Sequence, residues 1–357
     1  MKKKLPKMLW ISLVVICALA LFALIFINQP SFGRLPRGER LARIEKSPHY
    51  RGGQFHNLVE TPVMTSKKGG RVSGMIGFLL RDKSAIVPPA PMPAVKTDLR
   101  ALDRNQNLLV WFGHSSYLIQ LDGKRLLVDP VFGKAAPVDF ANRAFAGTGL
   151  YSAEDMPEID YLFISHDHWD HLDHATVRHI EGRVKKVICG LGVGEHFEYW
   201  GYPKEKIVEL DWNERAELDD GFAVDCLPAR HFSGRGLISD KSLWASFLVQ
   251  SPAQKLYLGG DGGYGDHFVE IARRFEGIDL AVLENGQYNE DWKYIHLMPE
   301  FLEKAARDLN AKTILTVHHS KYALATHPWD EPQKNAEKLA RDGLKVLMPK
   351  IGAPVGW

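Results

Sequence analysis

The chain has 357 residues, of which 45% are hydrophobic and 25% are charged, and its formal net charge at pH 7 is only +2. This composition is typical of a globular protein with one large core or two modest ones. The nearly balanced charge gives no electrostatic basis for nucleic-acid binding, so we expect no nucleic acid among the partners. Three cysteines without a C-x-x-C pair argue against a thiolate zinc site, and Cys189 and Cys226 are expected to be small buried hydrophobes.

The first element in chain order is an apolar stretch at residues 8–27, preceded by four lysines. As a helix it would rise about 30 Å, which is enough to cross the hydrocarbon core of a bilayer. A cleaved signal peptide is the alternative, but its apolar region is usually shorter, and no A-x-A site follows Ile27. We therefore predict that residues 1–27 form an uncleaved anchor of the plasma (inner) membrane. Charge on both sides of the helix favours a cytoplasmic N-terminus only mildly, and we expect the remaining chain on the non-cytoplasmic side.

Residues 28–106 are rich in Pro, Gly and Arg and show little hydrophobic periodicity. The stretch PPAPMPAV at 88–95 predicts extended chain rather than helix. We predict that residues 28–106 are partly a linker and partly an extension that wraps over the main domain.

From Asn107 onward the pattern is dominated by short strands. Asp122-Gly123 predicts a hairpin turn between strands at 117–121 and 125–128. Further strands are expected at 160–165, 185–190, 221–231, 242–251, 254–261, 279–284, 312–320 and 345–349, and helices at 174–182, 265–277, 298–310 and 332–342. This order suggests stacked sheets with helices outside them.

Candidate ligands for metal ions are concentrated in the sequence HDHWDH at 166–171, directly after an expected strand. In an extended turn His166 and His168 project to the same side, so they could bind one metal ion while Asp170 and His171 face a second. Imidazole and carboxylate groups are ligands that suit zinc. Because four residues cannot complete two coordination shells, further ligands are expected after later strands. Three residues occupy such positions: His231, Asp261 and His318.

Together with their flanks, these residues resemble the metallo-β-lactamase superfamily, and within it the branch of N-acylphosphatidylethanolamine-hydrolysing phospholipase D and its bacterial relatives. The segments that carry the resemblance include LFISHDHWDHLD, LPARHF, YLGGDGGYGDHF and VHHSKYAL. It covers the chain from about Trp111 to the C-terminus. The resemblance implies an α/β fold, the four-layer αββα sandwich, with residues 107–357 as the catalytic domain.

Carried over by position, the resemblance implies a centre of two zinc ions. The first ion would be held by His166, His168 and His231, the second by Asp170, His171 and His318, with Asp261 bridging the two. The motif places His318 in this role, whereas a strand register shifted by one residue would present His319 instead.

Further roles are expected for two of the ligands and for three residues near them. Asp170 and Asp261 are expected to act in catalysis as well as in binding. His296, in KYIHLMPE, is the candidate that protonates the leaving group, although a surface histidine near a helix start is the competing interpretation. Asp129 is placed to accept the second N–H of a ligating imidazole. His114 is either a residue of the cleft or an interior histidine.

The function implied is that of a zinc-dependent hydrolase in which a metal-bridging hydroxide attacks a phosphodiester, with N-acylphosphatidylethanolamine-like lipids as substrates. One alternative is a lactonase or another ester hydrolase with a small soluble substrate. A non-enzymatic alternative is a membrane-tethered metal-binding scaffold. The expected partners are a phospholipid or other phosphodiester substrate and the membrane, and a homodimer is left open.

Overall fold

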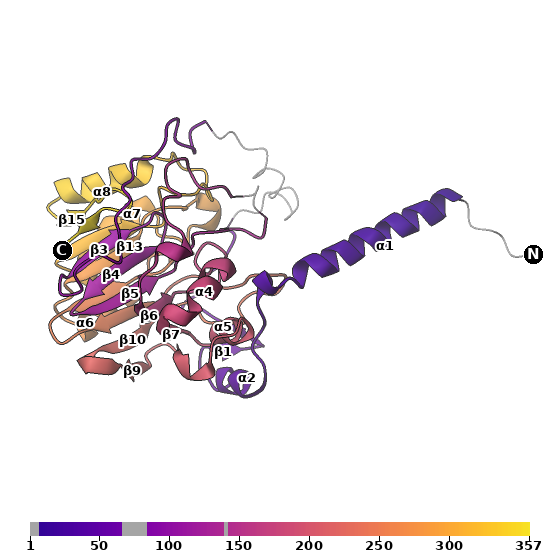
Figure 1. Ribbon diagram of the computed structural model, residues 1–357, viewed down its shortest axis with the longest axis horizontal. Helices are drawn as coiled ribbons and strands as arrows, with labels where there is room; N and C mark the ends of the chain where they lie inside the picture. Colours follow the sequence, from indigo (N-terminus) through magenta and orange to yellow (C-terminus); the bar gives the residue numbers. More distant parts are fainter. Residues whose placement is uncertain (1–6, 66–83, 139–141) are drawn as a thin grey trace, which may run out of the picture.

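The computed structural model describes residues 7–65, 84–138 and 142–357 of the chain. Helix α1 (Lys7–Ile27) extends away from a domain in which two sheets are stacked face to face (Figure 1). Helices cover the two outer faces of the stacked sheets. The order of layers is therefore helix, sheet, sheet, helix, and the predicted αββα sandwich is confirmed.

The first sheet has seven strands in the order β16-β3-β4-β5-β6-β7-β8. Its strands are β3 (Leu108–Trp111), β4 (Tyr117–Leu121), β5 (Lys124–Val128), β6 (Ile159–Ile164), β7 (Val184–Gly190), β8 (Ile207–Leu210) and β16 (Pro354–Val355). Strands β5 to β8 are parallel, and β16, β3, β4 and β5 are paired antiparallel. Asp122 and Gly123 form the predicted turn between β4 and β5, where both residues have positive φ angles.

The second sheet also has seven strands, in the order β15-β14-β13-β12-β11-β10-β9. Its strands are β9 (Arg215–Glu217), β10 (Ala223–Leu227), β11 (Ser246–Gln250), β12 (Lys255–Leu258), β13 (Leu280–Glu284), β14 (Thr313–Val317) and β15 (Val346–Leu347). Strands β12 to β15 are parallel, and β9 to β12 are antiparallel.

The helices of the domain correspond to the four predicted ones with two additions, α2 (Gly38–Ile44) and α5 (Gly194–Tyr199). The four predicted helices are α4 (His174–Ile180), α6 (His267–Arg274), α7 (Pro299–Leu309) and α8 (Glu331–Arg341). The sequence did not predict α2, α5 or the small hairpin of β1 (Tyr50–Arg51) and β2 (Gln54–Phe55). Elements this short carry too few residues for their periodicity to be recognised.

The core has three layers because each sheet is covered on both faces. In β6, Tyr161 and Phe163 pack between the two sheets, whereas Leu162 and Ile164 pack beneath α4 and α5. Residues of β11 to β14 alternate in the same way between the inter-sheet layer and a third cluster beneath α6 and α7. Burial on both faces explains why β6 reads as a continuous apolar run rather than as an alternating one.

The described parts of the extension lie against the domain. Ile44 and Phe55 are buried in the layer between the sheets. The Arg40 guanidinium forms ion pairs of 2.5 Å with Glu195 and 2.6 Å with Glu209, and the Glu195 carboxylate is buried. Residues 66–83 of the extension lie outside the described residues.

Truncating Ile44 tests how tightly this extension is packed. We expect Ile44→Ala to lower the free energy of unfolding by about 2–5 kcal/mol, since it leaves a cavity between two sheets that cannot collapse onto it. Urea unfolding of the full chain in detergent measures this loss. Met348→Ala, at a side chain that is 55% exposed, is the control and should change stability by less than about 0.5 kcal/mol. Equal stabilities of the two variants would mean that the extension is detached in solution.

Candidate metal centre

The candidate ligands lie together because seven strands end at the same edge of the sandwich. Strands β3, β5 and β6 point the same way in one sheet, as do β10, β12, β13 and β14 in the other. Polar residues stand at or just beyond these seven strand ends: His114, Asp129, His166, His231, Asp261, Glu284 and His318. Consecutive parallel strands deliver their carboxyl ends to one edge, which is where sites in such sheets form.

Three imidazoles form the first group of candidate ligands. The distance from His166 Nε2 to His168 Nδ1 is 2.8 Å, and that from His231 Nε2 to His168 Nδ1 is 3.2 Å. The His231 ring donates a hydrogen bond from Nδ1 to the backbone oxygen of Ile295 at 2.7 Å. Nε2 therefore carries no proton, and its lone pair points toward the group. Burial lowers the pKa of all three rings, so they are neutral, as metal ligation requires.

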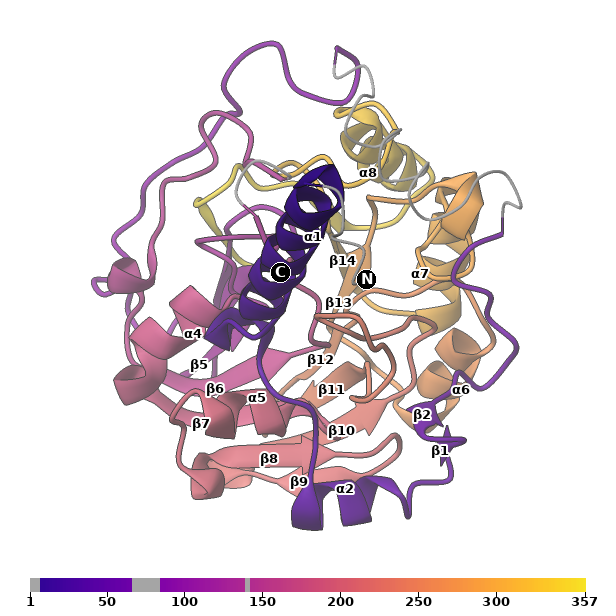
Figure 2. The same ribbon diagram turned by 90° about the vertical axis from the view of Figure 1, so that its right-hand side faces the viewer.

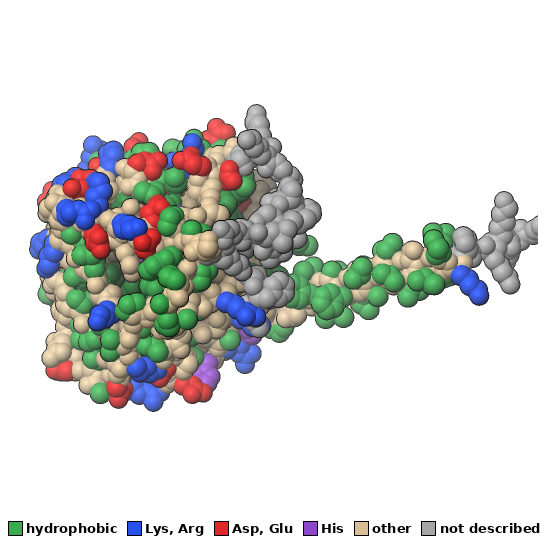
Figure 3. Space-filling model, turned by 90° about the horizontal axis from the view of Figure 1, so that it is seen from above, with side chains coloured by type: hydrophobic (Ala, Val, Ile, Leu, Met, Phe, Trp, Pro, Cys, Tyr) green, Lys and Arg blue, Asp and Glu red, His purple; other side chains and the backbone are tan. Residues whose placement is uncertain are grey.

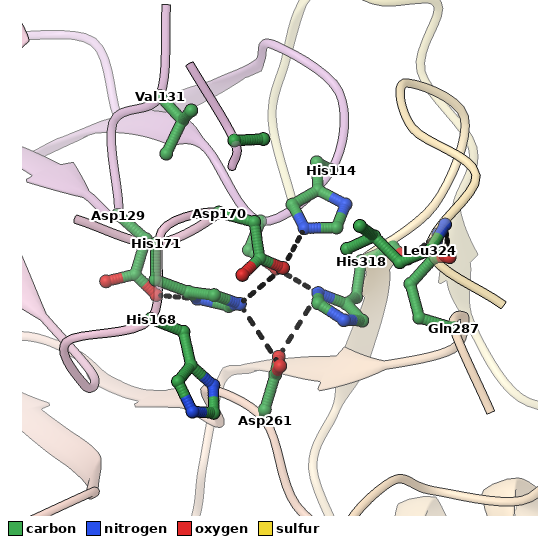
Figure 4. Close-up of polar contacts among 12 residues, drawn as sticks. His114, Asp129, Val131, His168, Asp170, His171, Asp261, Gln287, His318 and Leu324 are labelled. Atoms are coloured by element: carbon green, nitrogen blue, oxygen red, sulfur yellow. Dashed lines mark hydrogen bonds and ion pairs between the residues drawn. The ribbon is translucent and has the colours of Figure 1, made fainter. Parts of the chain in front are cut away.

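A second group faces the first and contains Asp170, His171 and His318 (Figure 4). Asp170 Oδ2 lies 3.6 Å from His171 Nε2. His114 belongs to the same group, because its Nε2 lies 2.9 Å from Asp170 Oδ2. Burial raises the pKa of Asp170, but His171 and His114 outweigh this effect and hold it well below its usual value, so this carboxylate is ionised.

Asp261 stands between the two groups. Its Oδ2 lies 3.1 Å from His171 Nε2 and 3.9 Å from His231 Nε2, and its Oδ1 lies 3.2 Å from His318 Nδ1 (Figure 4). The residue before it, Gly260, has a φ of +63°, and a Cβ there would lie 2.8 Å from the side chain of Ser165. Glycine therefore allows the tight turn that points Asp261 inward from β12.

The donor set fits divalent cations. His171 Nε2, Asp261 Oδ1 and His318 Nε2 are buried without a hydrogen-bond partner among the residues that the structure describes. Buried polar atoms in native proteins are almost always partnered, and a cation would supply the partner here. Burial lowers the pKa of His171, but Asp261, Asp170 and Asp129 outweigh it and raise that pKa well above the usual value. Three carboxylates, those of Asp129, Asp170 and Asp261, therefore surround this one imidazole, and a bound cation would balance their charge.

Asp129 holds one of the candidate ligands from behind. Its Oδ2 accepts from His171 Nδ1 at 2.8 Å and from Ser165 Oγ at 2.6 Å, while Oδ1 accepts from the Ser165 backbone N–H at 2.8 Å. This contact fixes the His171 ring with Nε2 toward the centre. His114, Asp129 and His318 all have positive φ angles, and non-glycine residues in this strained region commonly cluster at functional sites.

The side chains of His318 and His319, which directly follow β14, point in different directions. His318 faces Asp261, whereas the His319 ring points away and packs on Trp111 with 4.9 Å between ring centroids. His319 Nε2 lies 3.2 Å from the backbone oxygen of Thr316. His319 is therefore part of the packing behind the centre.

His296 and Glu284 form a buried pair at the edge of the centre. His296 Nδ1 is hydrogen-bonded to Glu284 Oε1, and Glu284 Oε2 accepts from the backbone N–H of Gly262 at 2.8 Å and of Leu297 at 3.2 Å. Burial lowers the pKa of His296, but the Glu284 carboxylate outweighs this and raises it. Burial raises the pKa of Glu284 to about 7. His296 is thus not a surface histidine, because it lines the site and is hydrogen-bonded to the buried Glu284 carboxylate.

Sequence reasoning did not identify Glu284, although a signal for it was present. Glu284 is the last residue of β13, and the stretch DLAVLE was itself predicted to be a strand. An acidic residue that ends an apolar strand is the same signature that marked Asp261. Its neighbour His296 comes from a loop, so their pairing is visible only in three dimensions.

A cavity of about 230 Å³ opens onto the candidate ligands. His168, Asp170, His231, Asp261, His296 and His318 line its floor. Its walls are largely apolar and include Phe232, Trp292, Ile295 and Leu324 of the domain. Val63 and Met64 of the extension complete them. The extension therefore contributes directly to the surroundings of the centre, which the sequence did not predict.

Residues 124–319 match the family described as the beta-lactamase superfamily domain. The chain belongs to this family. It is 30% identical to N-acyl-phosphatidylethanolamine-hydrolyzing phospholipase D 1 of Caenorhabditis elegans over 256 residues, which cover 66% of this chain and 70% of that protein. An uncharacterized protein of Mycobacterium tuberculosis is 38% identical over 317 residues, which cover 87% of this chain and 85% of that protein. The predicted relationship to this phospholipase branch of the metallo-β-lactamase superfamily is thereby confirmed.

Two further matches of this metallo-β-lactamase superfamily member concern one part of the chain and the fold, respectively. The protein named outer membrane protein RomA, of Klebsiella pneumoniae, is 56% identical over 99 residues, which cover 28% of this chain and 75% of that protein. Igni18, a metallo hydrolase from Ignicoccus hospitalis, has a similar structure with a TM-score of 0.52 at 19% identity, covering 70% of this chain and 98% of that one. At this identity the likeness concerns the fold. The family and the similarity to the phospholipase of Caenorhabditis elegans support a metal-dependent hydrolase.

Proposed function

We propose that the protein is a zinc-dependent phosphodiesterase of phospholipase D type that acts on N-acylphosphatidylethanolamine-like lipids. The observation that carries the proposal is the position of Asp261 between the two groups of candidate ligands. Its Oδ2 lies 4.0 Å from His166 Nε2 and 3.9 Å from His231 Nε2 of the first group, and its Oδ1 lies 3.2 Å from His318 Nδ1 of the second. One carboxylate between two such groups suits a pair of cations, which is a common device for phosphodiester hydrolysis. The relationship to phospholipases that hydrolyse N-acyl-phosphatidylethanolamine supports the substrate class.

The residues divide the chemical work among them. A pair of bound zinc ions would supply Lewis acidity and a hydroxide nucleophile near neutral pH. His166, His168 and His231 would hold one ion and Asp170, His171 and His318 the other. Asp261 orients the reacting groups between them. His296, held by Glu284 at the cavity, is positioned to donate a proton to the departing alcohol.

The apolar helix α1 supports membrane attachment of this enzyme. It has 21 residues, and an 18-residue window within it has a mean hydropathy of 3.0, with no residue of that window buried. We propose that α1 is an uncleaved single-pass anchor of the plasma (inner) membrane, with the domain on the non-cytoplasmic side. Such an anchor would keep the cavity near phospholipid substrates.

A substrate comparison tests the proposed function. Purified full-length protein loaded with zinc should release phosphatidic acid from vesicles that contain N-acylphosphatidylethanolamine, and it should also cleave bis-p-nitrophenyl phosphate. Hydrolysis of lactones alone would replace the proposal with a lactonase. A zinc-loaded, folded protein without turnover on any of these substrates would favour a metal-binding scaffold.

Removing metal should abolish activity and reduce stability. We expect dialysis against a chelator to lower turnover by at least about a thousandfold, since the seven candidate ligands cannot generate hydroxide at neutral pH without a cation. We also expect the melting temperature to fall, because binding to the native state alone stabilises it. Zinc should restore both properties. Unchanged activity at a zinc content below one ion per ten chains would contradict the metal centre.

A further inference from the structure

The foot of α1 packs directly against the loop that carries the metal-binding motif. Phe26, in the last turn of α1, packs edge-to-face on Phe32 with 5.4 Å between ring centroids, and Phe32 packs in the same way on Trp169 at 5.0 Å. Trp169 lies between His168 and Asp170 in HDHWDH. Figure 2, which looks along α1 onto the domain, shows this foot beside α4 and α5. The helix therefore leaves the domain beside residues 166–171, which we call the metal-binding loop.

Arg235 ties the same loop to the chain that follows α1. Its buried guanidinium donates from Nη1 to the backbone oxygens of Asp167 at 2.9 Å and Leu172 at 2.6 Å, and from Nη2 to that of Ser31 at 2.9 Å. It also lies 4.3 Å above the Trp169 ring. A buried guanidinium whose donors are used in this way holds its partners in one geometry. Arg235 thus joins the foot of the anchor and the metal-binding loop into one unit.

His196 makes a second connection of this kind. Its Nδ1 accepts from the backbone N–H of Arg34 at 3.1 Å, and its Nε2 donates to Asp167 Oδ2 at 3.1 Å. Asp167 Oδ1 in turn accepts from the backbone N–H of Gly234 at 2.7 Å. The chain after α1, the metal-binding loop and the loop at 234–241 therefore share a continuous set of hydrogen bonds.

The loop at 234–241 carries large apolar side chains that the described residues leave largely exposed. Leu237 is 83% exposed and Ile238 is 52% exposed, and Leu35 beside them is 45% exposed. These three residues line a common cavity with Ile27, the last residue of α1. Exposed apolar side chains gathered at one place mark a contact surface rather than ordinary surface variation.

We propose that Leu35, Leu237 and Ile238 enter the interfacial layer of the bilayer that α1 crosses. The inference rests on the proposed role of α1 as a membrane anchor and adds a second contact with the lipid. Because the apolar residues line a cavity with the end of the spanning helix, they stand where the headgroup region begins. Figure 3 shows α1 standing clear of the domain with hydrophobic side chains along its length.

Charge near the apolar residues favours a lipid surface as the occupant. Arg34 pairs with the buried Glu195 carboxylate at 2.6 Å, whereas Arg37, at 3.5 Å from the same carboxylate, keeps 68% of its side chain exposed beside Leu35. Apolar side chains that enter the acyl boundary, with basic residues at the level of phosphate groups, are typical of interfacial contacts. Through Arg235 and Trp169, such a contact would hold the metal-binding loop at the lipid surface.

Spin labels attached to cysteine test this contact in the full chain reconstituted into vesicles of phosphatidylcholine and phosphatidylglycerol. Cys17 in α1 is exposed, whereas Cys189 and Cys226 are buried, so Cys17 is the native residue that a label would reach. In a Cys17→Ala background, Leu237→Cys and Ile238→Cys place the label at the loop. Met348→Cys, at an exposed apolar residue elsewhere in the domain, is the matched control.

The measurement is the ratio of collisions of the label with oxygen, which is enriched in lipid, to collisions with a water-soluble nickel chelate. We expect this ratio at 237 and 238 to exceed that at 348 by about threefold or more, as for side chains buried roughly 5–10 Å into the interface. A lipid-like ratio at 17 with water-like ratios at 237 and 238 would overturn this inference and leave the anchor intact. A water-like ratio at 17 would overturn the anchor and this inference together. Labels at 237 and 238 that are shielded from both reagents would instead indicate a protein partner, which also overturns it.

Discussion

Asp261→Asn should lower kcat/KM for phosphodiesters by at least about a thousandfold, the range seen when a group that stabilises developing charge is lost. The amide has the shape of the carboxylate but lacks its charge. Asp261 is buried between His231 of the first group and His318 of the second, so both groups of candidate ligands would lose the shared anion. The measurement is kcat/KM on bis-p-nitrophenyl phosphate together with the zinc content per chain. Zinc content should fall toward one ion per chain or below.

The control for this change is Asp279→Asn. Asp279 directly precedes β13, at the end of this strand opposite the candidate metal centre. Its carboxylate pairs with Lys312 at 2.8 Å. A surface ion pair of this kind is worth about 0–1 kcal/mol, so activity and zinc content should match the unmodified protein. Full zinc content and full activity in Asp261→Asn would remove Asp261 from the centre, and with it the argument for two metals.

His296→Ala should show the second largest effect, and the effect should depend on the leaving group. With a lipid diester, whose alkoxide needs a proton to depart, we expect a loss of about a hundredfold to ten-thousandfold in kcat. With bis-p-nitrophenyl phosphate, whose phenolate leaves unprotonated, the loss should be below about tenfold. Steady-state rates on the two substrates measure the difference.

His179→Ala is the matched control, because His179 lies on the exposed face of α4 away from the cavity. It should change neither rate. Glu284→Gln adds a test of positioning, since Glu284 touches His296 rather than the space of the cavity. Glu284→Gln should lower the rate on the lipid diester more than the rate on bis-p-nitrophenyl phosphate, and both losses should be smaller than those of His296→Ala. Equal losses on both substrates would assign His296 to packing or metal retention instead of proton transfer.

Local sequence was sufficient for the features that depend on residues close together in the chain. HDHWDH follows the apolar strand β6, and each of the later candidate ligands follows another apolar strand, so the ligand types and their places were predictable. The same holds for α1, whose length and composition alone predict a helix long and apolar enough to cross a membrane. The layered arrangement was implied by resemblance, since strand patterns do not specify which strands pair.

Contacts between distant segments were decided only by the tertiary structure. Glu284 and His296 meet because β13 ends where the following loop returns, and a pair of this kind leaves no periodic trace in the sequence. Residues 28–65 look irregular, yet they supply Val63 and Met64 to the cavity and tie the foot of α1 to the metal-binding loop through Arg235. The physical reason is that burial and hydrogen bonding act between residues that are near in space. Hydrophobic periodicity, in contrast, records only which face of an element is buried.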